Sequence, residues 1–370
     1  MNGEKIGNDE ANNKKKVLVT GSGGLIGSEA CRFFLDKGFR VYGIDNNLRK
    51  YFFGDKGDTT ANIRSLEDRE GFENFYFDLR DREELLRFLR EHKFDLIIHT
   101  AAQPSHDWAA KEPFTDFDVN AVATLNLLEG FRLYSSEGVF IFTSTNKVYG
   151  DNPNNVNLVE NDKRYDYASD QSVLGVGSEG ISEEMSIDDC MHSLFGASKV
   201  AADVLAQEYG RYFGLNVGVF RGGCLTGPQH SAVELHGFLT YIIDCAISGK
   251  PYTIFGYKGK QVRDQIHSYD VVNAFYHFFL NPRKPGVYNI GGGKENAASV
   301  LEIIDILKSE YGLELNYSYD DRNRQGDHIC YYTDMGKFKK DYPEWKITKG
   351  LGEIIGEIVE RIKNRNNVGQ

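Results

Sequence analysis

Short runs of continuous apolar residues alternate with helical stretches along the first two-thirds of the chain. Amphipathic patterns that fit helices lie between several of these runs, as in Glu83–Glu91 and Thr124–Tyr134. Continuous apolar strands separated by helices indicate a parallel sheet that is covered on both faces. The predicted strands are Val17–Thr20, Val41–Ile44, Phe75–Phe77, Leu96–Thr100, Val139–Thr143 and Val217–Arg221. Ligands of such sheets bind beyond the carboxyl ends of the strands, so residues that follow each strand are candidates for a functional site.

This alternation breaks down after residue 150. The stretch 151–190 is polar, rich in turn residues and without periodicity, and a loop this long inside a compact domain is either functional or disordered. After Gly222, glycine, proline and aromatic residues mix with short elements, and Ser299–Tyr311 and Leu351–Lys363 fit helices. We therefore predict an α/β fold, a doubly wound parallel sheet with a smaller mixed α/β C-terminal lobe. Residues 1–15 are polar and are predicted to form a disordered leader.

A cluster of glycines follows the first predicted strand, in the segment VLVTGSGGLIG. Gly21, Gly24 and Gly27 are spaced three apart and lead into residues that suit a helix. This layout lets a strand turn tightly into a helix whose first amides approach a pyrophosphate. The next apolar strand ends in Asp45, near the offset expected for an acid that binds a ribose. The pattern predicts a Rossmann-type dinucleotide site, and the alternative is an ordinary glycine-rich strand–helix turn.

Composition narrows the class of protein further. The 370 residues carry a net charge of −11 and no basic stripe with interleaved aromatics, which argues against nucleic acid and anionic membranes as partners. No apolar run is long enough to span a bilayer, and the first sixteen residues lack the hydrophobic segment of a secretory signal. The five cysteines form no CxxC pair, which favours a reducing cytoplasmic location over a zinc site or a disulfide framework.

Several segments together resemble the extended short-chain dehydrogenase/reductase superfamily and, within it, the nucleotide-sugar epimerases and dehydratases. The matching segments are VTGSGGLIG, DNN, FDLRD, HTAAQ, DFDVNAVATLNLLE, TSTNKVYG, FGASKVAAD, FRGGCLTGP, GKQVRDQIHSYDVV and YNIGGG. TSTNKVYGD, a long loop and HSLFGASKVAAD are most similar to the CDP-paratose 2-epimerase subfamily. The resemblance implies an NAD-binding Rossmann domain over 16–221 with an active-site loop at 151–190. It also implies a mainly substrate-binding lobe over 222–365, from which 262–280 returns to the Rossmann domain.

The resemblance implies tightly bound NAD that is reduced and reoxidised within one turnover. Asp45 would accept both adenosine ribose hydroxyls and disfavour the extra phosphate of NADP, although Arg49 and Lys50 could serve such a phosphate. Asp78 matches an adenine contact, and a solvated turn carboxylate is the alternative. The residues implied to contact the cofactor are Gly21, Gly24, Leu25, Ile26, Gly27, Asp45, Asn46, Asp78, Leu79, Ala101, Ala102, Gln103, Asn120, Thr143, Lys199 and Arg221. For Asn120, the resemblance also allows a structural role that bends its helix or bridges to Lys199.

Oxidation of a sugar alcohol needs a hydride acceptor, a base and a polar group that fixes the hydroxyl. In the superfamily the last two are a tyrosine four residues before a lysine and a serine or threonine; Thr145 and Lys199 match the threonine and the lysine. The tyrosine position is Phe195, which cannot transfer a proton. The dehydratases carry an Asp-Glu pair where this chain has Asn146 and Lys147, so epimerisation is favoured over loss of water.

A substitute base should therefore exist if the protein is an enzyme, because a positioned proton-transfer group typically contributes about 10²–10⁴-fold in rate. His106 is the first candidate, since it follows the fourth predicted strand and imidazole titrates near neutrality. A solvent-exposed loop histidine or a diphosphate contact is its alternative. The further candidates are His192, Tyr165, Lys147 and Lys199.

The expected substrate is a nucleotide-diphosphate sugar, with a CDP-hexose favoured. Arg263 resembles the arginine that reads the diphosphate, with a surface pair to Asp264 as the alternative, and Arg324 could act likewise or pair with Asp327. The spacing of His230, Glu234 and His236 suggests a metal, but the resemblance implies sugar or phosphate contacts and no metal. The candidate substrate residues are Gln103, His106, Asn146, His192, Cys224, His230, His236, Arg263 and Arg324.

The leading interpretation is inversion of C2 of a CDP-hexose through a 2-keto intermediate. The alternatives are a 4-epimerase or other oxidoreductase acting on a UDP- or GDP-sugar, and a catalytically idle NAD-binding sensor, which Phe195 would suit. The helices around Thr124–Tyr134 and Phe195–Phe213 are those that the family uses for a two-fold contact, which implies a homodimer or a dimer of dimers.

Overall fold

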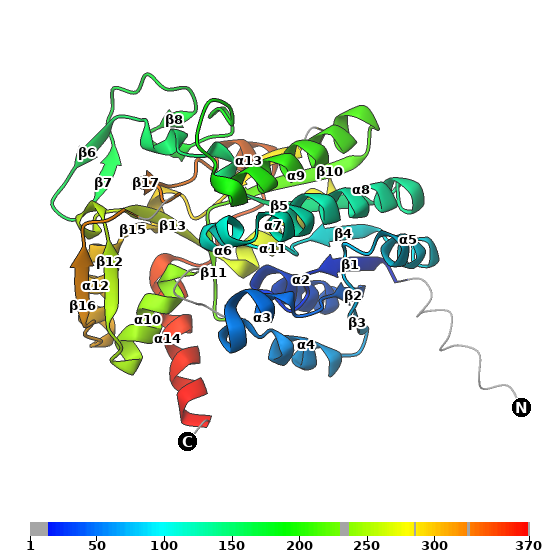
Figure 1. Cartoon of the computed structure of the whole chain (residues 1–370), viewed down its shortest axis with the longest axis horizontal. Helices are drawn as coiled ribbons and strands as arrows, with labels where there is room; N and C mark the ends of the chain where they lie inside the picture. The colour runs from blue at the N-terminus through cyan, green and yellow to red at the C-terminus, as the bar shows by residue number, and fades with distance from the viewer. Residues whose placement is uncertain (1–13, 230–236, 285, 324–325, 369–370) are drawn as a thin grey trace, which may run out of the picture.

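A computed structural model describes residues 14–229, 237–284, 286–323 and 326–368. The predicted leader 1–15 lies outside this range except for Lys14 and Lys15. Figure 1 shows a larger lobe that contains the central sheet and a smaller lobe beside it, which includes the C-terminal helix. Among the described residues, no helix is long and apolar enough to cross a membrane.

Seven parallel strands form the central sheet, in the order β14-β10-β5-β4-β1-β2-β3. They are β1 (Lys16–Thr20), β2 (Arg40–Ile44), β3 (Phe72–Phe75), β4 (Leu96–His99), β5 (Val139–Thr145), β10 (Asn216–Gly222) and β14 (Gly286–Ile290). The strand order reverses at β1, and such a switch point opens a crevice for ligands at the carboxyl edge. The structure therefore confirms the predicted doubly wound α/β fold.

Two strands differ from the prediction. The third strand is Phe72–Phe75 rather than Phe75–Phe77, because β3 is an edge strand that pairs only with β2 and keeps polar, partly exposed positions. The apolar residue Phe77 lies after the strand, where its ring packs on Phe88. The strand β14 was not predicted, although it is fully buried beside β10.

Helices cover both faces of the sheet (Figure 1). One face packs against α2 (Leu25–Asp36), α11 (Ser268–Leu280) and α13 (Gly336–Asp341), and the other packs against α5 (Arg82–Glu91), α8 (Ala123–Tyr134) and α9 (Ser193–Tyr212). Each face of the sheet has its own apolar core, and successive residues of a strand point into opposite cores. Val17 and Val19 face the first set of helices, and Leu18 faces the second. The other helices of this half are α3 (Leu48–Phe53), α4 (Thr60–Glu67), α6 (His106–Lys111) and α7 (Pro113–Phe117).

The smaller lobe contains a mixed sheet and its own core. The sheet is formed by β11 (Cys224–Thr226), β13 (Val262–His267), β15 (Ala297–Ser299) and β17 (Cys330–Tyr331), and a second pair is β12 (Tyr252–Phe255) with β16 (Tyr317–Asp320). A separate apolar core joins α10 (Phe238–Ser248), α12 (Val300–Tyr311) and α14 (Leu351–Val368). The chain returns from β13 to the larger lobe, where α11 packs against α2.

The predicted loop 151–190 contains two small hairpins, β6 (Leu158–Glu160) with β7 (Tyr165–Tyr167), and β8 (Val176–Gly177) with β9 (Gly180–Ile181). Its backbone is bound to the smaller lobe, since the Ile181 amide donates to the carbonyl of Tyr332 at 2.9 Å. It is also bound to the central sheet, since Glu183 Oε1 accepts from the Asn289 amide at 2.6 Å. The loop thus connects both lobes near the carboxyl edge of the sheet.

Candidate active site

A cavity of about 450 Å³ lies at the carboxyl edge of the central sheet and extends to the smaller lobe. Its lining includes one residue at or after each of five strands: Gly21 after β1, Asp45 after β2, Ala101 after β4, Thr145 at the end of β5 and Gly222 at the end of β10. The strands thus bring together residues that are far apart in the sequence. This is the size and position expected for a ligand site in an open α/β sheet.

The glycine turn forms one end of the cavity and depends on the absence of side chains. Gly21 has a φ of 71°, and a Cβ there would lie 2.8 Å from the Ala101 nitrogen. A Cβ on Gly27 would lie 2.0 Å from the carbonyl oxygen of Gly21, so this glycine lets α2 pack against the turn. Gly24, the residue before α2, has no side-chain cap. The first amides of the helix can therefore be approached closely by an anion.

Asp45 lies beside this turn. Its Oδ2 accepts from the Gly23 amide at 2.8 Å and its Oδ1 accepts from the Asn47 amide at 2.7 Å, while burial raises the pKa of the carboxyl. Arg49 also lines the cavity, and burial lowers the pKa of its guanidinium to about 10. The ammonium of Lys50 instead pairs with carboxylates outside the cavity lining, at 3.0 Å from Asp58.

Asp78 belongs to the same end of the cavity, together with Leu79 and Asn46. Arg80 holds its carboxylate in a two-pronged contact, with Nε at 3.0 Å from Oδ1 and Nη2 at 2.8 Å from Oδ2. Asn46 Nδ2 adds a third donor at 3.1 Å. Asp78 is therefore oriented by neighbours rather than merely solvated.

The other end of the cavity holds Thr145, Asn146, Lys147, Phe195 and Lys199. Lys199 Nζ donates to the carbonyl oxygen of Thr143 at 3.0 Å. Burial lowers the pKa of Lys199 to about 8, and the carboxylates of Asp203 and Asp116 oppose this shift. The ammonium form therefore predominates at neutral pH and places a positive charge beside Thr145.

His106 also lines this part of the cavity, next to Phe195, which cannot transfer a proton. The rings of His106 and Phe195 meet edge to face, with centroids 5.0 Å apart. His106 Nδ1 is 2.7 Å from the hydroxyl oxygen of Ser193, a residue with a φ of 61°. A non-glycine residue in this left-handed region is strained, and such strain persists where the surroundings hold it. Lys147 Nζ lies nearby and donates to the Gly326 carbonyl oxygen at 2.7 Å.

The smaller lobe supplies the remaining wall. Cys224 on β11 is paired in register with Gln265 on β13, and both line the cavity with Arg263. Burial raises the pKa of the Cys224 thiol to about 11, so the neutral thiol predominates at neutral pH. The alternative ion pair between Arg263 and Asp264 is not formed: Arg263 Nη1 donates to the Val262 carbonyl oxygen at 2.7 Å, and Asp264 Oδ2 accepts from the amides of Gly293 and Thr333.

Gly27, which supports the turn, and Tyr165, whose hydroxyl donates to Glu160 Oε2 at 3.4 Å, do not line the cavity. Four further candidates from the sequence also lie outside its lining. Gln103 Nε2 donates to Asp116 at 2.6 Å, and Asn120 donates to Asp116 and to the Gln103 carbonyl oxygen. Asn120 lies in a π-helical turn, Asp118–Val122, and its Oδ1 accepts from the backbone amide of Gln103 in the loop after β4 at 2.9 Å. The side-chain amides of Gln103 and Asn120 are therefore buried and bond to other residues of the protein.

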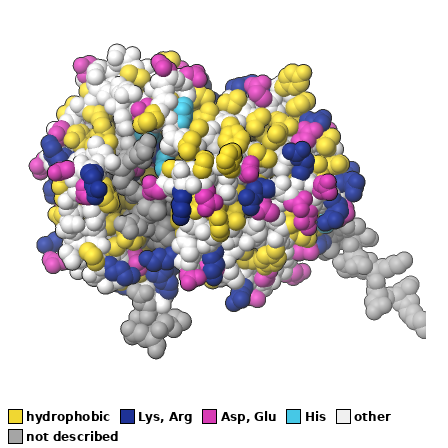
Figure 2. Space-filling model, viewed as in Figure 1, with side chains coloured by type: hydrophobic (Ala, Val, Ile, Leu, Met, Phe, Trp, Pro, Cys, Tyr) yellow, Lys and Arg dark blue, Asp and Glu magenta, His cyan; other side chains and the backbone are white. Residues whose placement is uncertain are grey.

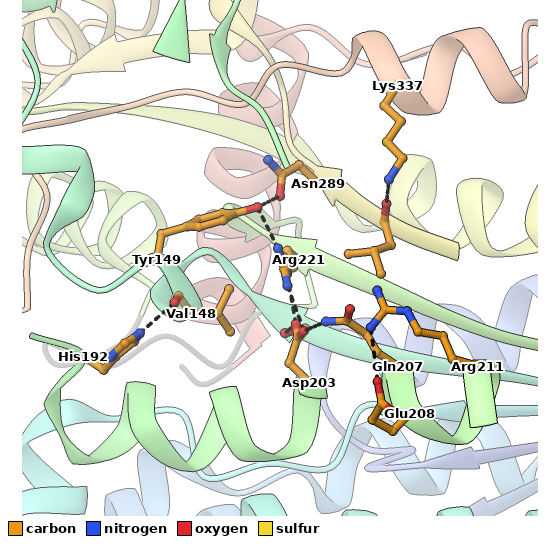
Figure 3. Close-up of polar contacts among 12 residues, drawn as sticks. Val148, Tyr149, His192, Asp203, Gln207, Glu208, Arg211, Arg221, Asn289 and Lys337 are labelled. Carbon is orange, nitrogen blue, oxygen red and sulfur yellow. Dashed lines mark hydrogen bonds and ion pairs between the residues drawn. The ribbon is translucent and has the colours of Figure 1, made fainter. Parts of the chain in front are cut away.

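Arg221 and His192, the other two, are shown in Figure 3. Arg221 is buried and pairs with Asp203, with Nη2 at 2.9 Å from Oδ1, while Nη1 donates to the Tyr149 hydroxyl at 3.2 Å. His192 Nε2 is 2.9 Å from the Val148 carbonyl oxygen. Both side chains thus bond to neighbouring parts of the protein, and neither lines the cavity.

Some predicted residues lie outside the described parts of the chain, namely His230, Glu234, His236 and Arg324. Among the residues that the structure does describe, no group of three or more His, Cys, Asp or Glu side chains could hold a metal ion.

Other cavity residues were not predicted from the sequence. They include Leu48, Phe52, Arg80, Thr226, Gln229, Phe238, Leu239 and Gln265. Strand alternation could have found Gln265, because it lies two residues after Arg263 on the same strand and therefore shares its face. No comparable sequence pattern marked the cavity residues that follow β11.

Comparisons with known proteins agree with this geometry. The model of the NAD dependent epimerase/dehydratase family matches residues 17–291. The CDP-paratose 2-epimerase of Salmonella typhi is 31% identical over 329 residues, which cover 87% of this chain and 92% of that protein. A putative UDP-glucose 4-epimerase of Methanocaldococcus jannaschii is 27% identical, over 95% of this chain and 99% of that protein. The structure of the Thermus thermophilus UDP-glucose 4-epimerase in complex with NAD aligns with a TM-score of 0.74 at 25% identity, over 94% of this chain and 99% of that chain.

The family model covers most of the chain, so the predicted resemblance is confirmed. The parts of the cavity fit the cofactor of this family: a turn that a Cβ would fill at Gly21, a carboxylate at Asp45 and a buried, unpartnered hydroxyl at Thr143. This protein is a member of the NAD-dependent epimerase/dehydratase family.

Proposed function

We propose that the protein is an epimerase that inverts C2 of a CDP-hexose, of the type that converts CDP-paratose to CDP-tyvelose. The observation that carries the proposal is one continuous cavity that joins the glycine turn and Asp45 to Thr145 and Lys199. Support for the CDP-sugar and for C2 comes from the similarity to the Salmonella typhi CDP-paratose 2-epimerase.

The cofactor would lie along the cavity. The first amides of α2 would bind its pyrophosphate, Asp45 its adenosine ribose, and Lys199 the ribose at the reacting end. NAD, when bound, supplies the acceptor and the donor of the hydride. Thr145 would hold the reacting hydroxyl, and the charge of Lys199 would stabilise negative charge that develops on its oxygen.

His106 is our proposal for the proton-transfer group. Oxidation breaks the C2–H and O–H bonds of the sugar; the imidazole takes the hydroxyl proton as the hydride leaves, and returns it when the ketone is reduced on the other face. No net oxidation results. Ser193 would orient the ring through its contact with Nδ1. The absence of carboxylates at Asn146 and Lys147 removes the pair that water elimination would need.

The fate of a deuterium at C2 tests the reaction. During turnover of CDP-paratose labelled at C2, we expect the label to stay on the product, because the hydrogen travels as a hydride between the sugar and the cofactor and does not exchange with water. Mass spectrometry of the product measures the retention. Complete exchange of the label into water would contradict the proposal and indicate deprotonation at carbon instead.

The second candidate is 4-epimerisation of a UDP-sugar. It is favoured by the Methanocaldococcus jannaschii relative and by the solved UDP-glucose 4-epimerase. Incubation with CDP-, UDP- and GDP-hexoses separates the two, since only one nucleotide series should be epimerised efficiently. A protein that binds NAD but reduces it with none of these sugars would be the idle sensor.

We also propose a two-fold dimer formed by α8 and α9. Figure 2 shows hydrophobic side chains gathered on the surface where Figure 1 places α7, α8 and α9. Large apolar side chains remain exposed on α8 and α9: Leu133, Leu194, Val204 and Tyr212. Two antiparallel helix pairs can bury such side chains in a symmetric four-helix contact.

An acidic substitution in this face tests the dimer. The wild-type protein is expected to show about twice the chain mass of 41.8 kDa in light scattering, and Val204→Asp is expected to shift it toward the single-chain mass. Tyr317→Asp, which also replaces an exposed apolar residue but lies in the smaller lobe, serves as the control. A wild-type protein of single-chain mass would refute the proposal.

A further inference from the structure

The wall that the smaller lobe contributes to the cavity carries polar atoms without partners. Thr226 Oγ1, Gln229 Oε1 and Gln265 Nε2 are buried and make no hydrogen bond with the described residues. All three residues line the cavity. Burial of an unpaired donor or acceptor costs stability, so such atoms are rare in folded proteins and call for an explanation. A ligand that pairs with them would provide one.

Gln265 is the most enclosed of the three, with 1% of its surface exposed. It is paired in register with Cys224, which comes two residues after Gly222, and Gly222 is itself paired with Thr145. Neighbouring strands lie about 4.8 Å apart. Two strand pairings and two residues of chain therefore connect Gln265 to Thr145, and both residues line the same cavity.

Gln265 is a neutral hydrogen-bond donor in a wall that also carries charged side chains. The positive charges of Lys147 and Arg263 both act to lower the pKa of the Cys224 thiol. The cations that could bind phosphate therefore lie close to this wall. Gln265 adds no charge but offers amide hydrogens that a sugar oxygen can accept. A site built to hydrogen-bond a hydroxyl discriminates strongly, because a substrate without that group leaves the buried amide unpaired.

We propose that Gln265 is a specificity-determining residue whose carboxamide donates a hydrogen bond to an oxygen of the sugar ring of the nucleotide sugar. This inference rests on the proposed function, because it takes a nucleotide sugar as the ligand. Thr226 and Gln229 extend the same polar wall. None of the three takes part in the proton or hydride transfer.

Calorimetric titration of a Gln265→Met variant tests the proposal, since methionine keeps the length of the side chain and removes the amide. Wild-type protein is first titrated with CDP-glucose and UDP-glucose, and the tighter ligand and its sugar-free nucleoside diphosphate are used further. We expect Gln265→Met to weaken binding of the sugar nucleotide about tenfold and to leave binding of the nucleoside diphosphate unchanged.

Stability provides a second readout. Without added nucleotide, thermal unfolding of Gln265→Met is expected at the same or a higher temperature than wild type, because a buried donor without a partner is replaced by an apolar group. Gln261→Met is the matched control: Gln261 lies next to β13 but not in the cavity lining, and its Nε2 bonds to the Phe255 carbonyl oxygen. It should leave both affinities unchanged.

The outcomes separate the two proposals. If the Gln265→Met variant binds both ligands as tightly as wild type, or loses the same affinity for both, then Gln265 does not bind the sugar. If wild-type protein binds neither CDP-glucose nor UDP-glucose and also fails to convert CDP-paratose, the proposed function itself fails.

Discussion

Replacement of His106 by asparagine is expected to lower the rate of sugar oxidation roughly 10²–10⁴-fold, the usual contribution of a positioned proton-transfer group. Asparagine can keep a hydrogen bond to Ser193 but cannot take up a proton. The reduction of NAD by the nucleotide sugar, followed by nicotinamide absorbance in a single turnover, measures the effect. Binding of the nucleotide sugar should change far less than the rate.

A second substitution distinguishes a chemical role of His106 from a structural one. In the superfamily a tyrosine at the position of Phe195 performs the proton transfer, and Lys199 is retained here four residues later. The double variant His106→Asn/Phe195→Tyr is therefore expected to recover a large part of the lost rate. If His106→Asn alone is as active as wild type, the proton passes through another group, and Lys147 becomes the next candidate.

Removal of Arg221 is expected to have the largest effect on stability. Arg221→Met would leave the Asp203 carboxylate buried without its cation, with 0% of its side chain exposed. Loss of one partner of a buried ion pair typically costs about 3–5 kcal/mol. The free energy of unfolding, from denaturant titration, measures the change. Ser144 and Gln207 hydrogen-bond the same carboxylate but supply no charge.

The control for this prediction lies on α9, the helix that carries Asp203. Arg211 pairs with Glu208 on the exposed side of α9 (Figure 3), and about half of each side chain remains exposed. Arg211→Met is expected to lower the free energy of unfolding by less than about 1 kcal/mol. Equal losses for Arg211→Met and Arg221→Met would contradict the role given to the buried pair.

The strands with high apolar content were predictable because both faces of each are buried. Five of the six predicted strands overlap those of the central sheet almost entirely, and α5, α8, α12 and α14 match the predicted helices. The edge strand β3 was misplaced because polar residues are tolerated where one side faces solvent. The strand β14 was missed because its position beside β10 depends on a long-range pairing that local pattern does not encode.

In the site, residues at the end of a strand or directly after it were predictable, as Thr145 and Asp45 illustrate. Polar residues near the same strand ends were harder to assign. Gln103, Asn120 and Arg221 resemble ligand contacts in sequence, yet in the structure each bonds to Asp116 or Asp203, carboxylates whose proximity depends on the fold. Conversely, Gln265 was not among the predicted residues, although it shares the strand face of Arg263, and its side-chain amide has no hydrogen-bond partner among the described residues.

The route of the chain between the lobes limits how the protein can be taken apart. After the smaller lobe has begun at β11, the chain goes back to contribute α11 and β14 to the larger lobe before it leaves again. A fragment that stops at Gly222 would lack the neighbour of β10 and the Asn289 side chain that bonds Tyr149. A hybrid protein that takes its substrate-binding lobe from a relative would therefore have to keep Ser268–Ile290 from the same parent as the amino-terminal part.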